Sequence, residues 1–416
     1  MSTYFKIGKK KVRAARLKRA VLASFTCAAP EVEARFAGFE LADWEGILYW
    51  LDISGLALYL LHRLTELGLE RCLPDPILGR FKRNLIENRA RTDALFHEAA
   101  AISSAMMRRG ISFALLKGIT LTPDSVPDCA LRWQIDLDLL VASCDATAAR
   151  HVLMIFGYAL HAVCGNSMEF TAGQSSAPDI GKIYRVHSQR SLELHMLSKT
   201  DRLSRAAIRD FGGAGIPTLA PADILVQQSA HLFKHLCGEH TRVSWVLEFW
   251  RHVEARRGDA NFWRAVEHIA ASEPQGELAM GAALLLTSLT FGAIAEEAWV
   301  KAAIDRLPQN VRLWVETYGL RVLLADSPGN KLYLILRQEL RSETQNRPTI
   351  RRLVFPTRLP PAITRGEPGE RIAERFVRYR TEAGFFLARL QFHVVEGLRY
   401  AIELSRWQRR LTETSR

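Results

Sequence analysis

The stretch that decides the fold is QIDLDLLV, at residues 134–141. Polar and apolar residues alternate over its first half and the second half is apolar, which predicts a β-strand that becomes buried. Side chains two residues apart on a strand share a face, so Asp136 and Asp138 are expected side by side. The apolar residues between and around them are expected on the other face: Ile135, Leu137 and Leu139.

Two carboxylates held side by side repel each other, and both ionise most easily when a divalent cation lies between them. Oxygen ligands of this kind suit Mg²⁺ or Mn²⁺, which would also hold the phosphates of a nucleotide. A solvated pair on an exposed strand is the alternative. Apolar residues flank Asp136 and Asp138 closely, however, and charges within a core strand require compensation. We therefore predict that both aspartates bind metal.

A third carboxylate is expected from SLELH, at residues 191–195, where Glu193 and His195 alternate with Leu192 and Leu194. If this strand lies near the first, Glu193 completes the metal shell or accepts the proton of an attacking hydroxyl. His195 is expected to orient Glu193 or to contact phosphate. An ordinary amphipathic strand at a sheet edge is the alternative.

Basic residues near these strands are candidate phosphate ligands. Lys117 and Gly118 follow ISFALL, residues 111–116, which is predicted as a buried strand. A glycine there lets backbone N–H groups approach a phosphate, and the lysine supplies a charge. Arg132, four residues before Asp136, is a second candidate.

His231 and His235 are expected on one face of a helix, with Lys234 beside them. A zinc site of the HExxH type is not supported, because Leu232 occupies the position of the glutamate. The three basic side chains are predicted to face the nucleotide or the acceptor, and a half-buried helix face is the alternative. No nucleophile elbow or Walker-type glycine loop is present in the sequence.

The order of patterns predicts an α+β fold, in which a small mixed sheet with flanking helices lies between N-terminal helices and a large helical C-terminal region. A helix is expected up to the stop at Gly110, and another at 146–156, capped by Asp145 and stopped by Gly157. Shorter strands are expected at 158–163, 168–171, 183–187 and 191–196. The expected units are a basic arm (1–20), an N-terminal helical region (21–84), the α+β core (85–215), a helical domain (216–340), and a Pro-containing linker with a basic helical C-terminus (341–416).

The net charge of +12 is concentrated at the two ends of the chain. Residues 1–20 carry eight Lys and Arg and no acid, and residues 341–416 carry sixteen Arg and eight Glu. This favours an anionic partner such as nucleic acid, lipid headgroups or a phosphorylated substrate, although solvated Arg-rich helices are an equal alternative. Six cysteines without a CxxC pair argue against a disulfide framework or a structural zinc site, and the longest uncharged run is expected to be a buried helix. We expect a cytoplasmic protein without a transmembrane segment.

Several motifs together resemble a known family: LLKG at 115–118, R-x3-DLDLLV at 132–141, a helix ending in Gly157-Tyr158, and LELH at 192–195. In order and spacing they look like the bacterial uncharacterised nucleotidyltransferase family, within the DNA polymerase beta-like superfamily. The resemblance covers roughly residues 85–260. HLFKH at 231–235, VSWVLE at 243–248 and, more weakly, LVFPTRLPP at 353–361 extend it.

This resemblance implies a metal-dependent transfer of a nucleotidyl group from a nucleoside triphosphate to a hydroxyl of a small molecule, peptide or protein. Asp136 and Asp138 would be the metal pair, Glu193 the third carboxylate, and Lys117-Gly118 the phosphate loop. That loop replaces the superfamily's usual Gly-Ser or Gly-Gly, and Glu248 stands where the subgroup often has Asp, so nucleotide handling stays open. The alternatives are an RNA-modifying enzyme, transfer of the γ-phosphoryl group, and a non-catalytic scaffold.

Overall fold

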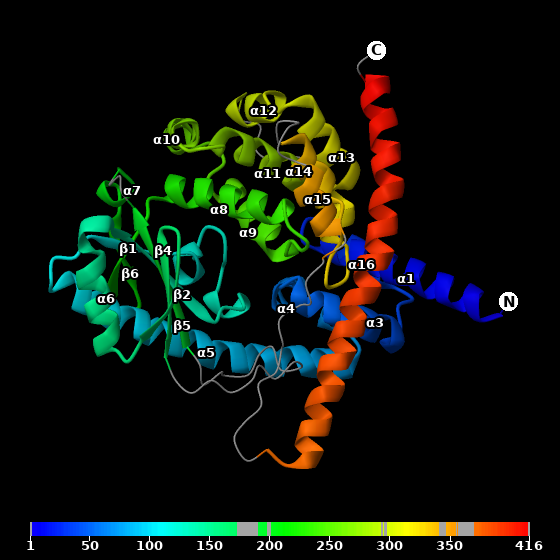
Figure 1. Cartoon of the computed structure of the whole chain (residues 1–416), viewed down its shortest axis with the longest axis horizontal. Helices are drawn as coiled ribbons and strands as arrows, with labels where there is room; N and C mark the ends of the chain where they lie inside the picture. Colours follow the sequence, from blue (N-terminus) through cyan, green and yellow to red (C-terminus); the bar gives the residue numbers. More distant parts are fainter. Residues whose placement is uncertain are drawn as a thin grey trace.

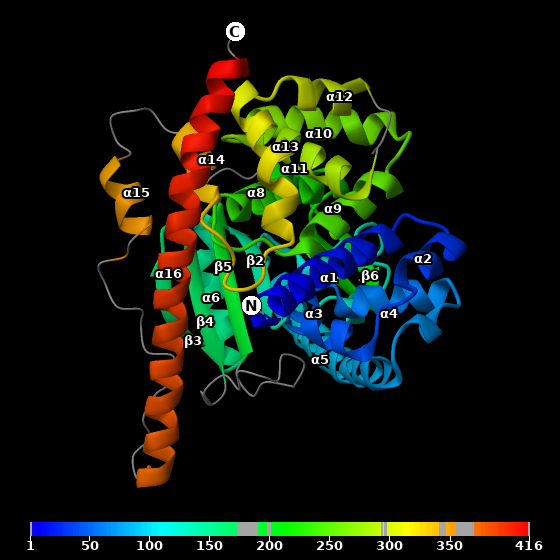
Figure 2. The ribbon, with the colours of Figure 1, turned by 90° about the vertical axis from the view of Figure 1, so that its right-hand side faces the viewer.

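The computed structural model describes residues 2–172, 190–197, 201–292, 294, 298–340, 347–354, 356 and 370–414. Helices make up the N-terminal part, a mixed sheet follows, and a second helical half ends in one long helix (Figures 1 and 2). The predicted α+β class is confirmed. Within the described part, no helix combines the length and the apolar character that crossing a membrane requires.

Among the described residues, seven strands form one sheet in the order β3-β4-β5-β2-β1-β7-β6. Their bounds are β1 Phe113–Leu116, β2 Asp136–Ala142, β3 Ala159–Cys164, β4 Ser167–Ala172, β5 Arg190–Leu197, β6 Ala207–Phe211 and β7 Ala214–Thr218. The central strand β2 pairs antiparallel with β1 and parallel with β5. In the parallel pair Asp136 lies opposite Ser191, and Asp138 opposite Glu193. The predicted proximity of the two acidic strands is therefore confirmed.

Each face of the sheet packs against a different set of helices (Figure 1). Leu137 and Leu139 of β2 and Leu192 and Leu194 of β5 are buried against helix α6 (Ala146–Ile155) and the last turns of α5 (Asp75–Met107). The opposite face carries Asp138, and its remaining apolar residues join the core of helices α8 (Pro221–Leu236) and α9 (Val243–Ala255). The alternation of β2 thus sends its aspartates toward the second helical half.

The other helices surround these layers. Their bounds are α1 Ser2–Ser24, α2 Ala29–Phe36, α3 Leu41–Ile53, α4 Ala57–Glu66, α7 Asp201–Ser204, α10 Ala260–Ser272, α11 Gly276–Phe291, α12 Ala298–Asp305, α13 Gln309–Leu323, α14 Tyr333–Glu339, α15 Arg347–Val354 and α16 Ile372–Thr414. The C-terminal half of α16 is anchored by Trp407, whose Nε1 donates to Glu339 Oε1 at 2.8 Å. Its other half extends beyond the body of the protein (Figures 1 and 2) and exposes large apolar side chains such as Ile372 and Phe376.

Most predicted elements are confirmed, with four corrections. The hairpin β6–β7 was not predicted, and helix α15 lies inside the expected linker. Asp145 does not cap α6, because its carboxylate accepts from the backbone N–H of Ser112 instead. Ile135 precedes β2 and is exposed, so it does not share the buried face of Leu137 and Leu139. The strand expected at 183–187 falls outside the described residues.

The expected basic arm is also corrected, because residues 2–24 form helix α1. Leu17, Ala20 and Val21 of this helix are buried in the main helical core. The Lys18 ammonium donates to the Leu324 carbonyl at 2.9 Å and to Asp326 at 2.6 Å, both at the end of α13. The second half of the expected arm is therefore part of the folded body. Helix α5 likewise runs through the expected boundary at residues 84 and 85.

Replacing Leu17 by Ala tests this correction. The side chain is fully buried, so its truncation should lower the free energy of unfolding by about 2–5 kcal/mol. Val12, on the same helix, is 71% exposed, and Val12→Ala should change the free energy by less than about 0.5 kcal/mol. Urea denaturation followed by circular dichroism measures both. If neither substitution changes the free energy of unfolding, residues 1–20 form an unpacked basic arm as the sequence suggested.

Candidate active site

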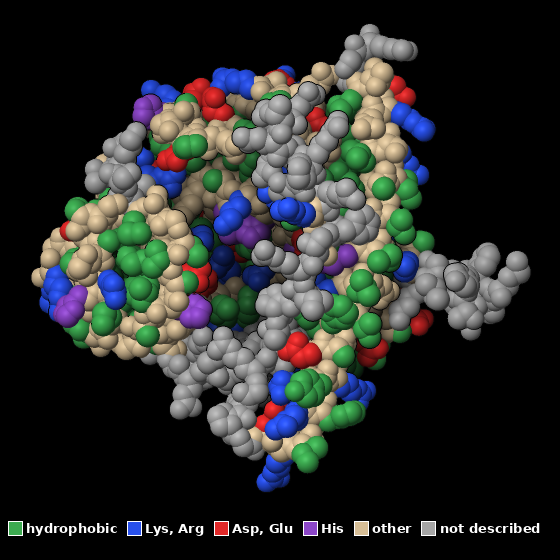
Figure 3. Space-filling model, viewed as in Figure 1, with side chains coloured by type: hydrophobic (Ala, Val, Ile, Leu, Met, Phe, Trp, Pro, Cys, Tyr) green, Lys and Arg blue, Asp and Glu red, His purple; other side chains and the backbone are tan. Residues whose placement is uncertain are grey.

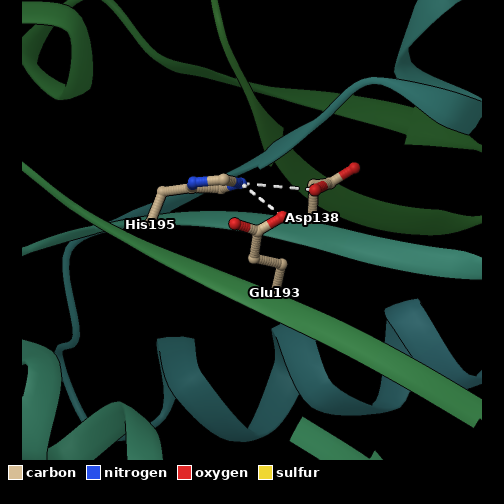
Figure 4. Close-up of side chains that lie close together, drawn as sticks. All are labelled: Asp138, Glu193 and His195. Atoms are coloured by element: carbon tan, nitrogen blue, oxygen red, sulfur yellow. Dashed lines mark hydrogen bonds and ion pairs between the residues drawn. The ribbon is translucent and has the colours of Figure 1, made fainter. Parts of the chain in front are cut away.

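The register of β2 and β5 brings Asp138, Glu193 and His195 together (Figure 4). The His195 Nε2 atom lies 3.3 Å from Asp138 Oδ1 and 3.6 Å from Glu193 Oε2. One potential ligand atom from each of the three side chains lies within 4.8 Å of the others. The predicted meeting of Asp138 with Glu193 and His195 is thus present in the fold. Asp136, the other aspartate predicted to bind metal, is not part of this group.

Asp138 is the most enclosed member of this group, at 4% exposure. Burial alone opposes its ionisation, but the hydrogen bond from His195 and the positive charge of Lys117 outweigh burial and lower its pKa. The Lys117 ammonium lies 3.3 Å from Asp138 Oδ1. Asp138 is therefore held as an anion by two basic groups that reach the same oxygen.

Asp136 lies two residues earlier on the same strand face, at the exposed start of β2. Desolvation by the surrounding protein, and then the negative charge of Asp138, raise its pKa. The two aspartates therefore interact as predicted, and the pKa of one is raised while that of the other is lowered. A cation beside both would favour the ionised form of each.

The turn after β1 has a strained backbone. Lys117 has φ +55° and ψ −163°, a conformation that residues other than glycine rarely adopt, and Gly118 follows with φ +54°. A Cβ atom on Gly118 would meet the Gln134 side chain at 2.2 Å. Gln134 in turn donates from Nε2 to the Asp136 carbonyl at 2.7 Å. The Lys117-Gly118 pair is thus packed tightly against the start of β2, with the lysine directed at Asp138.

Arg132 forms an ion pair with Glu248, and Glu248 in turn accepts a hydrogen bond from a third, distant segment. Its Nε lies 3.4 Å from Glu248 Oε2 of α9, and the Tyr59 hydroxyl of α4 donates to Glu248 Oε1 at 2.9 Å. Burial and the charge of Glu248 raise the pKa of Tyr59, so the hydroxyl remains a donor. The N-terminal helices therefore contribute to the site by fixing the carboxylate that orients Arg132.

His231 and His235 share a helix face, as predicted, and both contact one tryptophan. Their ring centroids lie 4.6 and 4.3 Å from that of Trp245. Burial lowers the pKa of His231 to about 3 and that of His235 to about 4, so both are neutral at pH 7. They can form hydrogen bonds but do not supply positive charge. Lys234 is exposed and does not line the same space.

Several of the residues described above, but not Lys234, line a hollow of about 570 Å³ between the sheet and helices α8 and α9. Basic, acidic and histidine side chains gather there in the space-filling view (Figure 3). The predicted residues in its lining are Lys117, Arg132, Asp136, Asp138, His231 and His235. The rest of the lining consists of residues that were not predicted as site residues: Trp133, Gln134, Ile135, Gly238, Glu239, His240, Arg242 and Trp245. Trp133 and Gln134 lie within the motif around Asp136, so proximity in sequence could have found them.

The donors of Asp138, Glu193 and His195, which we call the acidic cluster, fit a divalent cation. Two atoms that bind one Mg²⁺ at 2.0–2.1 Å can be no more than about 4 Å apart. His195 Nε2 lies 3.3 Å from Asp138 Oδ1 and 3.6 Å from Glu193 Oε2, and all three donor atoms lie within 4.8 Å of one another. Two carboxylates and one imidazole suit Mn²⁺ and Mg²⁺, and the imidazole favours the former. In the described part of the chain no other group of three His, Cys, Asp or Glu residues meets this distance criterion, and His231 with His235 belongs to no such group. The geometry can thus hold one cation at Asp138.

A family model described as "Uncharacterised nucleotidyltransferase" matches residues 40–292. The chain belongs to this family. The matched region covers more than half of the chain, from helix α3 to helix α11, and contains both acidic strands. It extends in both directions beyond the predicted range of roughly residues 85–260 and includes Tyr59 and Glu248, but LVFPTRLPP at 353–361 lies outside it.

One solved structure that is similar to part of this chain is an antigenic nucleotidyltransferase-like protein from Paracoccidioides brasiliensis, with 11% sequence identity and a TM-score of 0.30. That similarity covers 45% of this chain and 92% of the other. No curated protein matches the chain.

Removal of the Glu248 carboxylate should leave the Arg132 charge uncompensated in the protein interior. We expect Glu248→Ala to lower the free energy of unfolding by about 3–5 kcal/mol. Glu254, on the same helix, forms only a surface ion pair with Arg257, and Glu254→Ala should cost about 0–1 kcal/mol. Chemical denaturation compares the two variants. Similar small losses in both would show that Arg132 does not depend on Glu248.

Proposed function

We propose that this protein transfers a nucleotidyl group from a nucleoside triphosphate to a hydroxyl group of a small molecule, peptide or protein. The supporting observation is that Asp138, which lines the hollow together with basic side chains, also meets Glu193 and His195, which lie outside that lining. Membership of a nucleotidyltransferase family supports the same reaction class. Asp136, Asp138 and Glu193 are the proposed carboxylates, and Mg²⁺ or Mn²⁺ the proposed cofactor.

The proposed residues divide into those that bind the cation and those that bind phosphate. A divalent cation bound at the carboxylates would supply positive charge for the triphosphate. The Lys117 ammonium lies beside Asp138 and compensates its negative charge. When a bound cation compensates that charge instead, Lys117 can turn toward the β- and γ-phosphates. Arg132, fixed by Glu248, is the second proposed phosphate contact. His231 and His235 would contact the nucleotide as neutral groups, and exposed Lys234 can reach only its periphery.

The chemical step forms one bond and breaks one. The oxygen of the acceptor hydroxyl attacks the α-phosphorus in line, and the bond from that phosphorus to the bridging oxygen breaks, releasing pyrophosphate. The hydroxyl proton passes to Glu193 or to His195, whichever of the two does not hold the cation. Asp138 would remain an anion, because the cation beside it would compensate its charge once Lys117 turns toward the phosphates.

Replacement of the aspartates tests the proposal. Asp136→Asn combined with Asp138→Asn should leave the far-ultraviolet circular dichroism unchanged and reduce transfer by at least about 100-fold. Calorimetry should also show loss of Mg²⁺-dependent ATP binding. Asp305→Asn, which removes a carboxylate from an exposed ion pair on α12, is the matched control and should behave as the wild type. An unchanged Mg²⁺-ATP affinity in the double variant would refute the proposed site.

The group transferred can be determined directly. Wild-type protein is incubated with each nucleoside triphosphate, labelled in turn at the α- and γ-phosphates, with Mg²⁺ or Mn²⁺ and cell extract. Appearance of the α-label on an acceptor, with the γ-label in released pyrophosphate, supports nucleotidyl transfer. Appearance of the γ-label alone on an acceptor would contradict it and assign phosphoryl transfer instead.

A further inference from the structure

One wall of the hollow is built from planar groups in mutual contact rather than from carboxylates. The Arg242 guanidinium carbon lies 4.9 Å from the ring centroid of Trp133 and 5.5 Å from that of Trp245. His231 and His235 flank Trp245, and their own ring centroids are 4.6 Å apart. We call Trp133, Arg242 and Trp245 the aromatic wall. All three line the same hollow as Asp136 and Asp138.

The aromatic wall has the chemistry of a base-stacking surface. Flat rings and guanidinium planes both stack on nucleobases, and stacking of this kind tolerates any base, because every base has a π face. The neighbouring histidines have pKa values lowered to about 3 and 4. Neutral imidazole has one donor and one acceptor nitrogen, which suits the edge of an uncharged base better than it suits a phosphate.

The wall and the carboxylates lie close enough for one nucleotide to contact both. Trp133 precedes Asp136 by three residues, so their Cα atoms can be no more than about 10 Å apart even in a fully extended chain. The volume of about 570 Å³ falls in the usual range for sites that enclose a small molecule. The hollow therefore has an anionic end suited to a cation-bound triphosphate and a planar end suited to a base.

We infer that the aromatic wall stacks against the nucleobase of the bound nucleoside triphosphate, and that the carboxylates and Lys117 bind its phosphates. This inference rests on the proposed function for its ligand. Trp245 and Trp133 are binding residues in this account. Arg242, whose guanidinium carbon lies within 5.5 Å of both ring centroids, would cover the base from the side of helix α9.

Binding measurements on the full-length protein separate the two ends of the hollow. The probes are Mg²⁺-ATP and Mg²⁺-tripolyphosphate, which carries the same phosphate chain without base or ribose, and calorimetry gives their dissociation constants. The wild type should bind ATP at least about tenfold more tightly than tripolyphosphate. Trp245→Ala and Trp133→Ala should each weaken ATP about tenfold and leave tripolyphosphate unchanged. Trp245→Phe, which keeps a flat ring, should retain most of the ATP affinity.

A second tryptophan on helix α9 supplies the matched control. Trp250 is half-buried like Trp245, but its ring packs against Phe291, with centroids 5.5 Å apart. Trp250→Ala should lower stability without changing the ratio of the two dissociation constants. If Trp250→Ala changes this ratio as much as Trp245→Ala does, the effect comes from packing and the inference fails.

The outcomes distinguish this inference from the proposed function. Equal affinity of the wild type for ATP and tripolyphosphate, or equal losses for both probes in Trp245→Ala, would overturn base stacking and leave the phosphate site intact. If Trp245→Ala and Trp133→Ala lower the preference for ATP over tripolyphosphate as expected, but the wild type transfers no label, base stacking is supported and nucleotidyl transfer is overturned. Failure of the wild type to bind either probe would overturn both.

Discussion

The parallel pairing of β2 with β5 is the constraint on which the site depends. Side chains at paired positions of neighbouring strands lie on the same face, and the register sets Asp138 beside Glu193. A shift of one residue would turn Glu193 and His195 into the apolar layer above α6 and bring Leu192 and Leu194 beside Asp138. The buried leucines that alternate with the acids oppose this shift, because each is at most 2% exposed. The same apolar contacts that stabilise the sheet therefore fix the geometry of the acidic cluster.

Burial of Asp138 has a cost that the surrounding residues offset. A carboxylate within the protein remains ionised only when nearby cations or donors compensate its lost hydration. Lys117 does so from the end of β1 and His195 from within β5, and Lys117 adopts an unfavourable backbone conformation beside Gly118. A strained backbone at a buried charge, in a hollow open to solvent, is typical of functional sites. The arrangement thus favours a ligand-binding role for this face over a purely structural one.

Much of the central architecture could be predicted from the sequence, because it depends on local patterns. Alternation predicted β2 and β5, and the shared face of Asp138 with Glu193 and His195 followed once the strands paired. Contacts between segments far apart in the chain could not be predicted in this way. Nothing near Tyr59 indicates that its hydroxyl meets Glu248, 189 residues later, and nothing in the basic N-terminal stretch shows that Leu17 is buried. Charge composition suggested an arm at residues 1–20, whereas the contacts that hold its second half come from distant residues such as Leu324 and Asp326.

We propose that Asp138 shares a divalent cation with its neighbours on β5. Crystals grown with Mn²⁺ and a non-hydrolysable nucleoside triphosphate, measured at a wavelength where manganese scatters anomalously, would locate that cation. We expect an anomalous peak within about 2.5 Å of an Asp138 oxygen and of a ligand atom from Glu193 or His195. A peak located instead between His231 and His235, or nucleotide bound in the hollow with no peak at Asp138, would contradict it.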